Sequence, residues 1–275
     1  MDGLAHISET FAAVRAQGRA ALMPYFTLGF PNPQVSLSIV EAIAGSGADL
    51  IELGIPFSDP LADGPTIQRS TQVALEQGMN VARCLELVSQ MRARGMTQPL
   101  LLMGYYNPIL AYGGRGGVER FVAAAAAAGA DGFIVPDLPP EEAGEMEAAC
   151  RARRCALVYL AAPTSTPERI AMLAARTSGF LYLVSLTGVT GARETLPPGL
   201  AGFVKRVRAL ASAPLAVGFG IATPEQARAV GQLADGVIVG SALIQAVGEA
   251  SDPVQAASAF VSGLSEALIS KQPAL

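Results

Sequence analysis

The sequence predicts an α/β protein, a (β/α)8 barrel with an N-terminal helix covering the barrel floor. Short apolar runs alternate with amphipathic helical stretches along the 275 residues. About eight such strand–helix units in ~250 residues are typical of this fold. The runs are continuously apolar, as in parallel strands that are buried on both faces. The helix-to-strand junctions also repeat, as Gly47-Ala48-Asp49, Gly129-Ala130-Asp131 and Ala234-Asp235-Gly236. We expect a single domain over residues 1–275.

Each predicted element follows from its apolar pattern. The N-terminal helix is indicated by Ile7, Phe11 and Val14, which share one face at helical spacing. The predicted strands are Ala21–Leu28, Asp49–Leu53, Pro99–Met103, Gly132–Val135, Ala156–Leu160, Phe180–Leu186, Leu215–Phe219 and Val237–Val239. The predicted helices are Ser36–Ala44, one from Thr66, Val81–Arg94, Val118–Ala128, Glu141–Arg151, Pro167–Arg176, Gly199–Ala211, Pro224–Gln232 and one after Gly240-Ser241.

An open, doubly wound sheet would use the same units. That fold places a glycine-rich turn, G-x-G-x-x-G, after its first strand to bind a dinucleotide phosphate. Here Leu28-Gly29-Phe30-Pro31-Asn32-Pro33 follows the first strand instead. The barrel is therefore the better interpretation.

Composition and charge exclude several classes of protein. Charged residues make up 15% and hydrophobic residues 51% of the chain, which excludes a disordered protein. The formal charge of −4 and the pI near 5.1 lack the basic character of nucleic-acid binders. No apolar stretch approaches the ~18 residues that a membrane span needs. Asp2, His6 and Glu9 occupy the region where a signal peptide would be basic and then apolar. We expect a soluble, cytoplasmic protein without a nucleic-acid or membrane partner.

Residues that usually hold metals or form covalent intermediates are scarce. Cys84, Cys150 and Cys155 contain no C-x-x-C pair, and His6 is the only histidine. We therefore expect no metal site, disulfide framework or histidine-based triad. The chemistry of this protein should depend on carboxylates, hydroxyls and backbone amides.

Glu52 is the most unusual residue at a strand end, where barrels place their active sites. It interrupts the apolar run Asp49–Leu53, and a carboxylate buried there without a partner is costly or has a raised pKa. One interpretation is that backbone amides or a tyrosine hydroxyl form hydrogen bonds with the Glu52 carboxylate. The other interpretation, which we favour, is that Glu52 is a general acid/base. Asp59 and Asp63 follow on the same loop, where aspartate also forms turns and caps helices. Asp63 is close enough to act with Glu52 on one ligand.

Glycine-bearing segments follow the last three predicted strands. They are Gly188-Val189-Thr190-Gly191, Gly218-Phe219-Gly220 and Gly240-Ser241. Barrels build phosphate sites from the loops after strands seven and eight together with a helix N-terminus, whose backbone N–H groups bind the anion. We expect a phosphate site here.

The segment Glu52-Leu53-Gly54-Ile55-Pro56-Phe57-Ser58-Asp59-Pro60-Leu61-Ala62-Asp63-Gly64-Pro65 resembles the signature of the tryptophan synthase α chain family. The resemblance covers nearly the whole chain and implies cleavage of indole-3-glycerol phosphate to indole and glyceraldehyde 3-phosphate, a lyase step of tryptophan biosynthesis. It also implies an α2β2 heterotetramer, in which the β subunit carries pyridoxal phosphate and this chain carries no cofactor. Further matching segments are Tyr105-Tyr106-Asn107-Pro108, Pro136-Asp137-Leu138-Pro139, Tyr182, Gly188-Val189-Thr190-Gly191, Gly218-Phe219-Gly220-Ile221 and Gly240-Ser241-Ala242.

The resemblance implies a role for each matching residue. Glu52 and Asp63 are the catalytic pair. The chain departs from the family pattern at Phe30, at Leu186 and in the glycine-rich turn Gly113–Gly117. The indole pocket is formed by Tyr25, Tyr105, Tyr182 and Phe219, the closing loop and phosphate site by Thr190, Gly191, Gly220, Gly240 and Ser241, and the face toward the β subunit contains Asp59 and Asp137.

The residue inventory suits a retro-aldol cleavage in which the indole ring is the electron sink. Lys205 and Lys271 are poorly placed for a Schiff base, and His6 alone cannot build a metal site. Glu52 would protonate indole C3, and Asp63 would accept the N1–H hydrogen bond and stabilise the cationic ring. Two alternatives remain: a stand-alone indole-3-glycerol phosphate lyase, and a non-catalytic barrel that binds a phosphate ligand.

Overall fold

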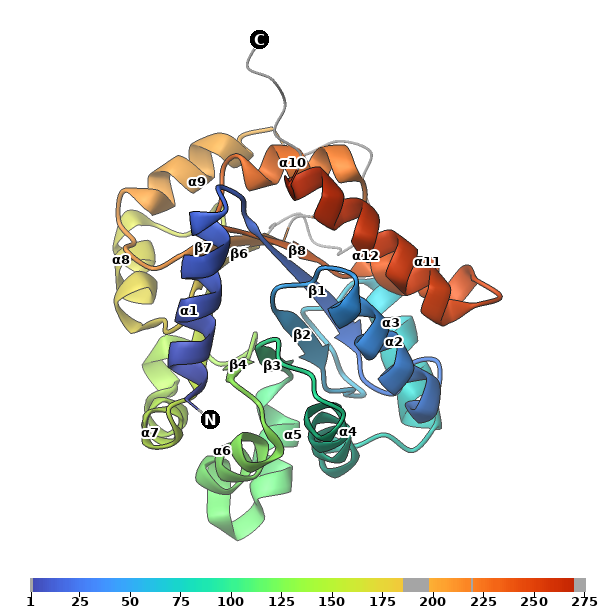
Figure 1. Ribbon diagram of the computed structural model, residues 1–275. Helices are drawn as coiled ribbons and strands as arrows, with labels where there is room; N and C mark the ends of the chain where they lie inside the picture. The colour runs from blue at the N-terminus through green and yellow to red at the C-terminus, as the bar shows by residue number, and fades with distance from the viewer. Residues whose placement is uncertain (1, 185–197, 219, 270–275) are drawn as a thin grey trace.

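The strands of this protein form a closed parallel barrel. The computed structural model describes residues 2–184, 198–218 and 220–269. Within them the strands pair in chain order, and β8 closes the barrel against β1 (Figure 1). The strands are β1 (Ala21–Thr27), β2 (Ile51–Gly54), β3 (Leu100–Met103), β4 (Gly132–Ile134), β5 (Ala156–Ala161), β6 (Leu181–Val184), β7 (Leu215–Gly218) and β8 (Gly236–Val239). The predicted (β/α)8 architecture is confirmed.

Helices follow the strands and surround the barrel (Figure 1). They are α1 (Gly3–Ala16), α2 (Pro33–Gly45), α3 (Pro65–Glu76), α4 (Val81–Ala93), α5 (Tyr106–Gly113), α6 (Gly117–Ala128), α7 (Gly144–Arg153), α8 (Pro167–Arg176), α9 (Leu200–Arg208), α10 (Pro224–Gly231), α11 (Ser241–Glu249) and α12 (Pro253–Ile269). Side chains cap several of them. Asn32 before α2, Asn80 before α4 and Thr166 before α8 each accept a hydrogen bond from the backbone N–H three residues later.

α5 and α12 are not among the helices predicted from the sequence. The first N–H of α5 donates to Asp137, which lies in the loop after β4, at 2.9 Å. The long helix α12 packs against α2, α10 and α11. The helix predicted over Glu141–Arg151 begins only at Gly144, because Pro140–Glu142 form a separate 3-10 turn.

α1 covers the floor of the barrel, as predicted (Figure 1). Its residues Ile7, Phe11 and Val14 are buried in one cluster with inward-facing strand residues, and the ring centroids of Phe11 and Phe180 are 5.8 Å apart. At Gly3 the contact is so close that a Cβ atom would lie 2.3 Å from the carbonyl oxygen of Asp131. The N-terminal helix is therefore a packed part of the barrel.

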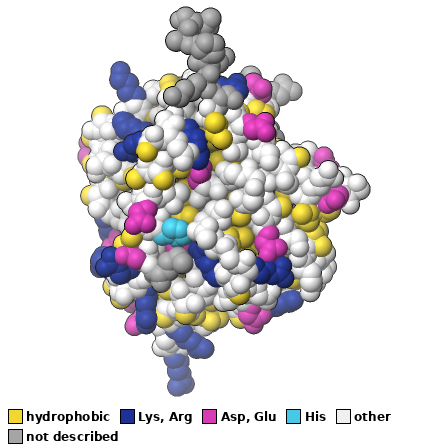
Figure 2. All heavy atoms as spheres, in the orientation of Figure 1, with side chains coloured by type: hydrophobic (Ala, Val, Ile, Leu, Met, Phe, Trp, Pro, Cys, Tyr) yellow, Lys and Arg dark blue, Asp and Glu magenta, His cyan; other side chains and the backbone are white. Residues whose placement is uncertain are grey.

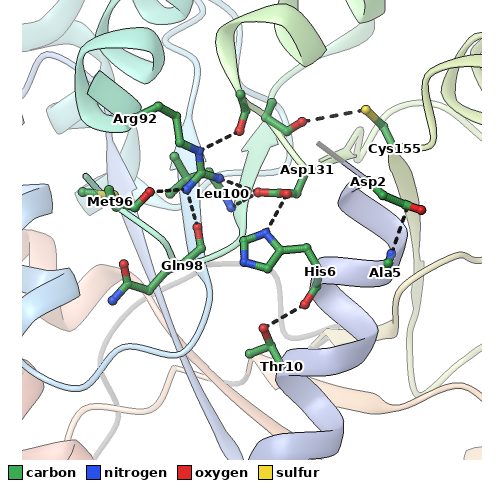
Figure 3. A network of polar contacts seen from close by, with 12 residues as sticks. Asp2, Ala5, His6, Thr10, Arg92, Met96, Gln98, Leu100, Asp131 and Cys155 are labelled. Atoms are coloured by element: carbon green, nitrogen blue, oxygen red, sulfur yellow. Dashed lines mark hydrogen bonds and ion pairs between the residues drawn. The ribbon is translucent and has the colours of Figure 1, made fainter. Parts of the chain in front are cut away.

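The repeated junction aspartates join neighbouring strands near this floor. Asp131, just before β4, accepts hydrogen bonds from the backbone N–H of Leu100 at 2.8 Å and from Arg92 at 2.6 Å (Figure 3). His6 of α1 contacts the same carboxylate through Nδ1 at 2.8 Å. The other two junctions repeat this pattern, Asp49 with Leu22 N–H and Arg19, and Asp235 with Leu215 N–H and Arg208.

Asp131→Ala should destabilise the fold by about 3–5 kcal/mol, the typical cost of removing one partner of a buried ion pair. The change takes the carboxylate away from Arg92, from the Leu100 N–H and from His6 on the floor helix. Urea unfolding measures the loss. Glu9→Ala, on the exposed side of α1, is the control and should stay within about 0.5 kcal/mol of wild type. A loss for Asp131→Ala no larger than that of the control would contradict this role.

Candidate active site

Glu52 is the second residue of β2 and has no exposed surface. Its backbone pairs with Tyr25 on β1 and Leu101 on β3. Among the described residues, its two carboxylate oxygens are the only buried side-chain nitrogen or oxygen atoms that have no hydrogen-bond partner. Burial raises the pKa of this carboxyl from 4.5 to about 8, so that it holds its proton at neutral pH. The described residues thus offer no amide or hydroxyl that would make Glu52 a purely structural carboxylate.

Asp63 lies in the loop between β2 and α3. Burial raises the pKa of its carboxyl from 3.8 to about 6, and a hydrogen bond with Tyr105 opposes this rise. The Tyr105 hydroxyl also accepts a hydrogen bond from the backbone N–H of Ala62 at 2.9 Å. The residue that caps α3 is Gly64, so the helix does not use the Asp63 side chain as its N-cap. Tyr105 holds this carboxylate in place.

A cavity of about 80 Å³ lies at the C-terminal ends of the strands. Burial raises the pKa of Tyr25 and Tyr182 in its wall, and the nearby Glu52 carboxylate adds to the rise in both. The backbone of Glu52 pairs with Tyr25, so Glu52 lies next to a residue of the wall, although it has no exposed surface of its own. The lining residues are Tyr25, Asp63, Ile67, Met103, Tyr182, Gly218, Gly220, Ile238, Gly240 and Ser241.

One part of the cavity wall is glycine backbone and a helix N-terminus. Gly240 is the N-cap of α11, and Ser241 is its first residue. The first N–H groups of a helix have no intrahelical partner and attract anions. Gly220 has a φ of 69°, a left-handed conformation that favours glycine. The described lining contains no lysine or arginine, which fits an anion site made of backbone amides. Three predicted site residues lie outside the described ranges: Thr190, Gly191 and Phe219.

The chain is similar to known proteins over most of its length. The family described as the tryptophan synthase alpha chain matches residues 11–268. This chain belongs to that family. A tryptophan synthase alpha chain of Chloroflexus aggregans is 56% identical over 238 residues, which are 86% of this chain and 88% of that protein.

Solved structures agree with this membership. A structure of Mycobacterium tuberculosis tryptophan synthase has a TM-score of 0.89 at 39% identity and covers 96% of this chain and 98% of its own. A tryptophan synthase subunit alpha from Legionella pneumophila has a TM-score of 0.88 at 40% identity and covers 98% of each chain. The tryptophan synthase alpha chain is a lyase of tryptophan biosynthesis that cleaves indole-3-glycerol phosphate, and it works with a β subunit. The enzyme class and reaction implied by the sequence are confirmed.

Two aspartates of this tryptophan synthase alpha chain family member lie outside the cavity, and the sequence suggests that they face the β subunit. Both Asp59 and Asp137 are exposed. The Asp59 carboxylate accepts a hydrogen bond from the Ser58 hydroxyl at 2.5 Å. Asp137 binds the first N–H of α5, as described above. Asp137 therefore also has a structural role, which the sequence does not reveal.

An apolar groove beside the β2–α3 loop is not predicted from the sequence. Its volume is about 450 Å³, and it lies between this loop, the start of α4 and α5. Phe57 forms one wall and packs on Tyr105, with ring centroids 5.4 Å apart, while Leu61 in the same loop is 92% exposed. Large apolar residues in a loop of prolines and aspartates are the signal that could have revealed this surface.

Other kinds of site find no support in the part of the chain that the structure describes. No group of histidine, cysteine, aspartate and glutamate side chains there could hold a metal ion. No helix in the described ranges is long and apolar enough to cross a membrane. On the face shown in Figure 2, basic and acidic side chains are interspersed.

Proposed function

We propose that Glu52 and Asp63 are the catalytic pair with which this chain cleaves indole-3-glycerol phosphate. The observation that carries the proposal is Glu52, a fully buried carboxyl that has no hydrogen-bond partner among the described residues and lies beside a cavity at the strand ends. Proteins seldom keep such a group without a use, because its burial costs stability. A neutral carboxylic acid in an apolar wall is suited to donate a proton to a ring carbon.

The reaction needs an electron sink, and the indole ring supplies it. Glu52 donates its proton to C3, and the positive charge spreads to N1. The carbon–carbon bond then breaks, its electron pair returns to the ring, and the hydroxyl proton of the glycerol chain passes to the Glu52 carboxylate. The products are indole and an aldehyde, and the acid is restored. Asp63 accepts the N1–H hydrogen bond and stabilises the cationic ring as an anion in a water-poor site.

The remaining cavity residues bind the two ends of the substrate. The tyrosines Tyr25, Tyr105 and Tyr182 surround the ring, and Tyr105 also fixes Asp63. Gly220, Gly240 and Ser241 hold the phosphate through backbone amides. The same proposal extends to three residues on the strength of the sequence resemblance alone: Thr190 and Gly191 at the phosphate and Phe219 at the ring.

The free enzyme should be active only in a limited pH range. The reaction needs Asp63 ionised, which requires a pH above its pKa of about 6. It also needs Glu52 protonated, which requires a pH below about 8. We therefore expect kcat/KM to rise through about pH 6, to fall through about pH 8 and to peak between them. Asp63→Asn should remove the acid limb from its residual activity. A profile of kcat/KM that is flat from pH 5 to pH 9 would contradict these two roles.

We propose that the chain assembles with its β subunit as an α2β2 heterotetramer, and that pyridoxal phosphate is bound only by the β subunit. The β2–α3 loop contains the exposed Leu61 and Asp59, and its residues Pro56–Ser58 line the apolar groove, which supports this loop as the contact surface. A large exposed apolar side chain in a loop that also lines an apolar groove is typical of an interface. The cytoplasmic location expected from the sequence stays a prediction.

Leu61→Asp should abolish most of the increase in indole formation that the β subunit causes, while the activity of the isolated chain stays unchanged. A charge would replace an apolar anchor, and such anchors typically contribute about 2 kcal/mol or more to binding, which is at least tenfold in affinity. Leu210→Asp, exposed after α9, is the matched control. A normal response of Leu61→Asp to the β subunit would contradict this surface.

The two alternatives predict different results for wild type in the same assay. A stand-alone lyase releases indole and does not respond to the β subunit. A non-catalytic barrel binds the substrate and releases none.

A further inference from the structure

A chain of buried hydroxyls leads away from the cavity behind Tyr25. The Tyr25 hydroxyl is 3.4 Å from Oγ1 of Thr27 on the same strand. Thr27 Oγ1 is 2.7 Å from Oγ of Ser70 on α3, and Ser70 Oγ donates to the carbonyl oxygen of Ile67 at 2.8 Å. Thr27 and Ser70 have almost no exposed surface. The chain therefore joins a cavity side chain to the helix that follows the Asp63 loop.

We assign the direction of the hydrogen bonds in this chain of hydroxyls from its last member, the carbonyl oxygen of Ile67. A carbonyl oxygen has no proton, so the proton between Ser70 and Ile67 belongs to Ser70. Ser70 then has no second proton, and the one between Ser70 and Thr27 must come from Thr27. By the same count, Tyr25 supplies the proton between itself and Thr27. With this order the Tyr25 proton is used within the hydroxyl chain, and the lone pairs of its oxygen are left to accept another hydrogen bond.

The Tyr25 side chain is also fixed in place at both ends. Near the α11 N-terminus, a Cβ atom on Gly240 would lie 3.3 Å from Cβ of Tyr25. At the other end, a Cβ atom on Gly54 would lie 2.0 Å from the Tyr25 hydroxyl oxygen, so only glycine leaves room for it. Asp63 is close enough to raise the pKa of Tyr25. The Tyr25 side chain is thus held between β2 and the start of α11 and cannot turn far.

We infer that Thr27 and Ser70 are positioning residues that present the Tyr25 oxygen to the substrate as a hydrogen-bond acceptor for a hydroxyl of the glycerol chain. An ionised Asp63 cannot supply that donor, because a carboxylate only accepts. In the proposed function on which this inference rests, the indole N–H belongs to Asp63. Glu52 holds a proton, but it makes no hydrogen bond with Tyr25, and in the proposed function it gives that proton to indole C3. The donor that remains is the hydroxyl of the substrate's chain that does not pass its proton to Glu52.

Thr27→Val removes the acceptor of the Tyr25 proton while keeping nearly the same shape. The freed Tyr25 proton should then turn to the Asp63 carboxylate, and the substrate hydroxyl should lose its acceptor. We expect kcat/KM for indole formation to fall roughly threefold to tenfold, the usual effect of one neutral hydrogen bond. Tyr25→Phe should cause a similar loss. Thr27→Ser, which restores the hydroxyl, should recover most of the wild-type rate.

The double variant Tyr25→Phe/Thr27→Val distinguishes positioning from packing. If Thr27 acts through Tyr25, the double variant should be no worse than Tyr25→Phe alone. Binding of a propanol phosphate analogue, which keeps the indole ring and phosphate but lacks free chain hydroxyls, should be unchanged in Thr27→Val. A packing defect in Thr27→Val would weaken the analogue as much as the substrate. The losses of activity in Tyr25→Phe and Thr27→Val would then multiply in the double variant.

Ser70→Ala tests the far end of the chain and should reproduce the Thr27→Val pattern in a milder form. Its control is Ser46→Ala. Ser46 likewise bonds a carbonyl of the helix before it, at Ala42, and a second serine, Ser258. Ser46 is the C-cap of α2, however, and Ser258 lies on α12. The inference would be overturned if the losses of Tyr25→Phe and Thr27→Val multiplied in the double variant, or if Thr27→Val weakened the analogue as much as the substrate. Either result could be obtained with a wild-type chain that still releases indole. A wild-type chain that binds the substrate but releases no indole would instead refute the proposed function.

Discussion

Glu52→Gln should lower indole formation about 10²–10⁴-fold, the usual contribution of a general acid. Glutamine has the shape of a protonated glutamate but cannot donate an acidic proton to indole C3. Because Glu52 has no partner among the described residues, the change breaks no internal hydrogen bond there. Substrate binding should therefore be nearly intact, and the loss should appear in kcat. A purified variant that keeps more than about a tenth of the wild-type activity would show that Glu52 is not the acid.

The stability of Glu52→Gln gives an independent check. The folded carboxyl has a pKa of about 8, against an ordinary value of 4.5. Between these two values the unfolded chain has already released this proton while the folded chain retains it, so this group makes wild type less stable as the pH rises. Glutamine has no such proton. The Tm of the variant relative to wild type should therefore increase from about pH 5 to pH 8.

Asp63→Asn should lower the turnover about 10²–10³-fold, the effect of losing one electrostatic contact to a charged transition state. The amide oxygen still accepts the N1–H hydrogen bond, but it lacks the negative charge that stabilises the protonated ring. The loss should fall on kcat more than on KM, because the charge matters after C3 is protonated. The measurement is steady-state indole formation with the β subunit present.

A melting curve separates this role from a structural one. Asparagine forms the same turns as aspartate, and the α3 N-cap is Gly64, so Asp63→Asn should melt near the wild-type temperature. Tyr105→Phe is a useful companion, because it removes the hydroxyl that holds Asp63 and should cost less than the loss of the charge itself. Near wild-type turnover by a stable Asp63→Asn protein would reduce Asp63 to a residue of the loop.

The barrel and its most unusual residue could be predicted because both are local signals. Continuous apolar runs mark the strands, and a single carboxylate inside the run of β2 draws attention to Glu52. The repeat of aspartates at the junctions is visible as well. The purpose of this repeat cannot be seen in the sequence, because Asp131 binds Leu100 and Arg92, which are distant from it along the chain. Local patterns give the elements and their order, while long-range partners come only from the fold.

The same limit applies within the site. Asp59 and Asp63 look alike in the sequence, and only Tyr105, which comes from the end of β3, distinguishes the buried carboxylate from the exposed one. The hydroxyl chain from Tyr25 to Ser70 crosses from a strand to a helix and follows no periodic pattern. The apolar groove likewise joins segments that are separate along the chain.

Infrared spectroscopy of the carboxyl groups tests the central claim, that burial keeps Glu52 protonated so that it can act as the acid. The difference spectrum between wild type and Glu52→Gln should show the C=O band of a neutral carboxylic acid at neutral pH. That band should disappear as the pH rises through about 8, in step with the fall in kcat/KM. A Glu52 carboxylate band at neutral pH, with full activity, would contradict the account.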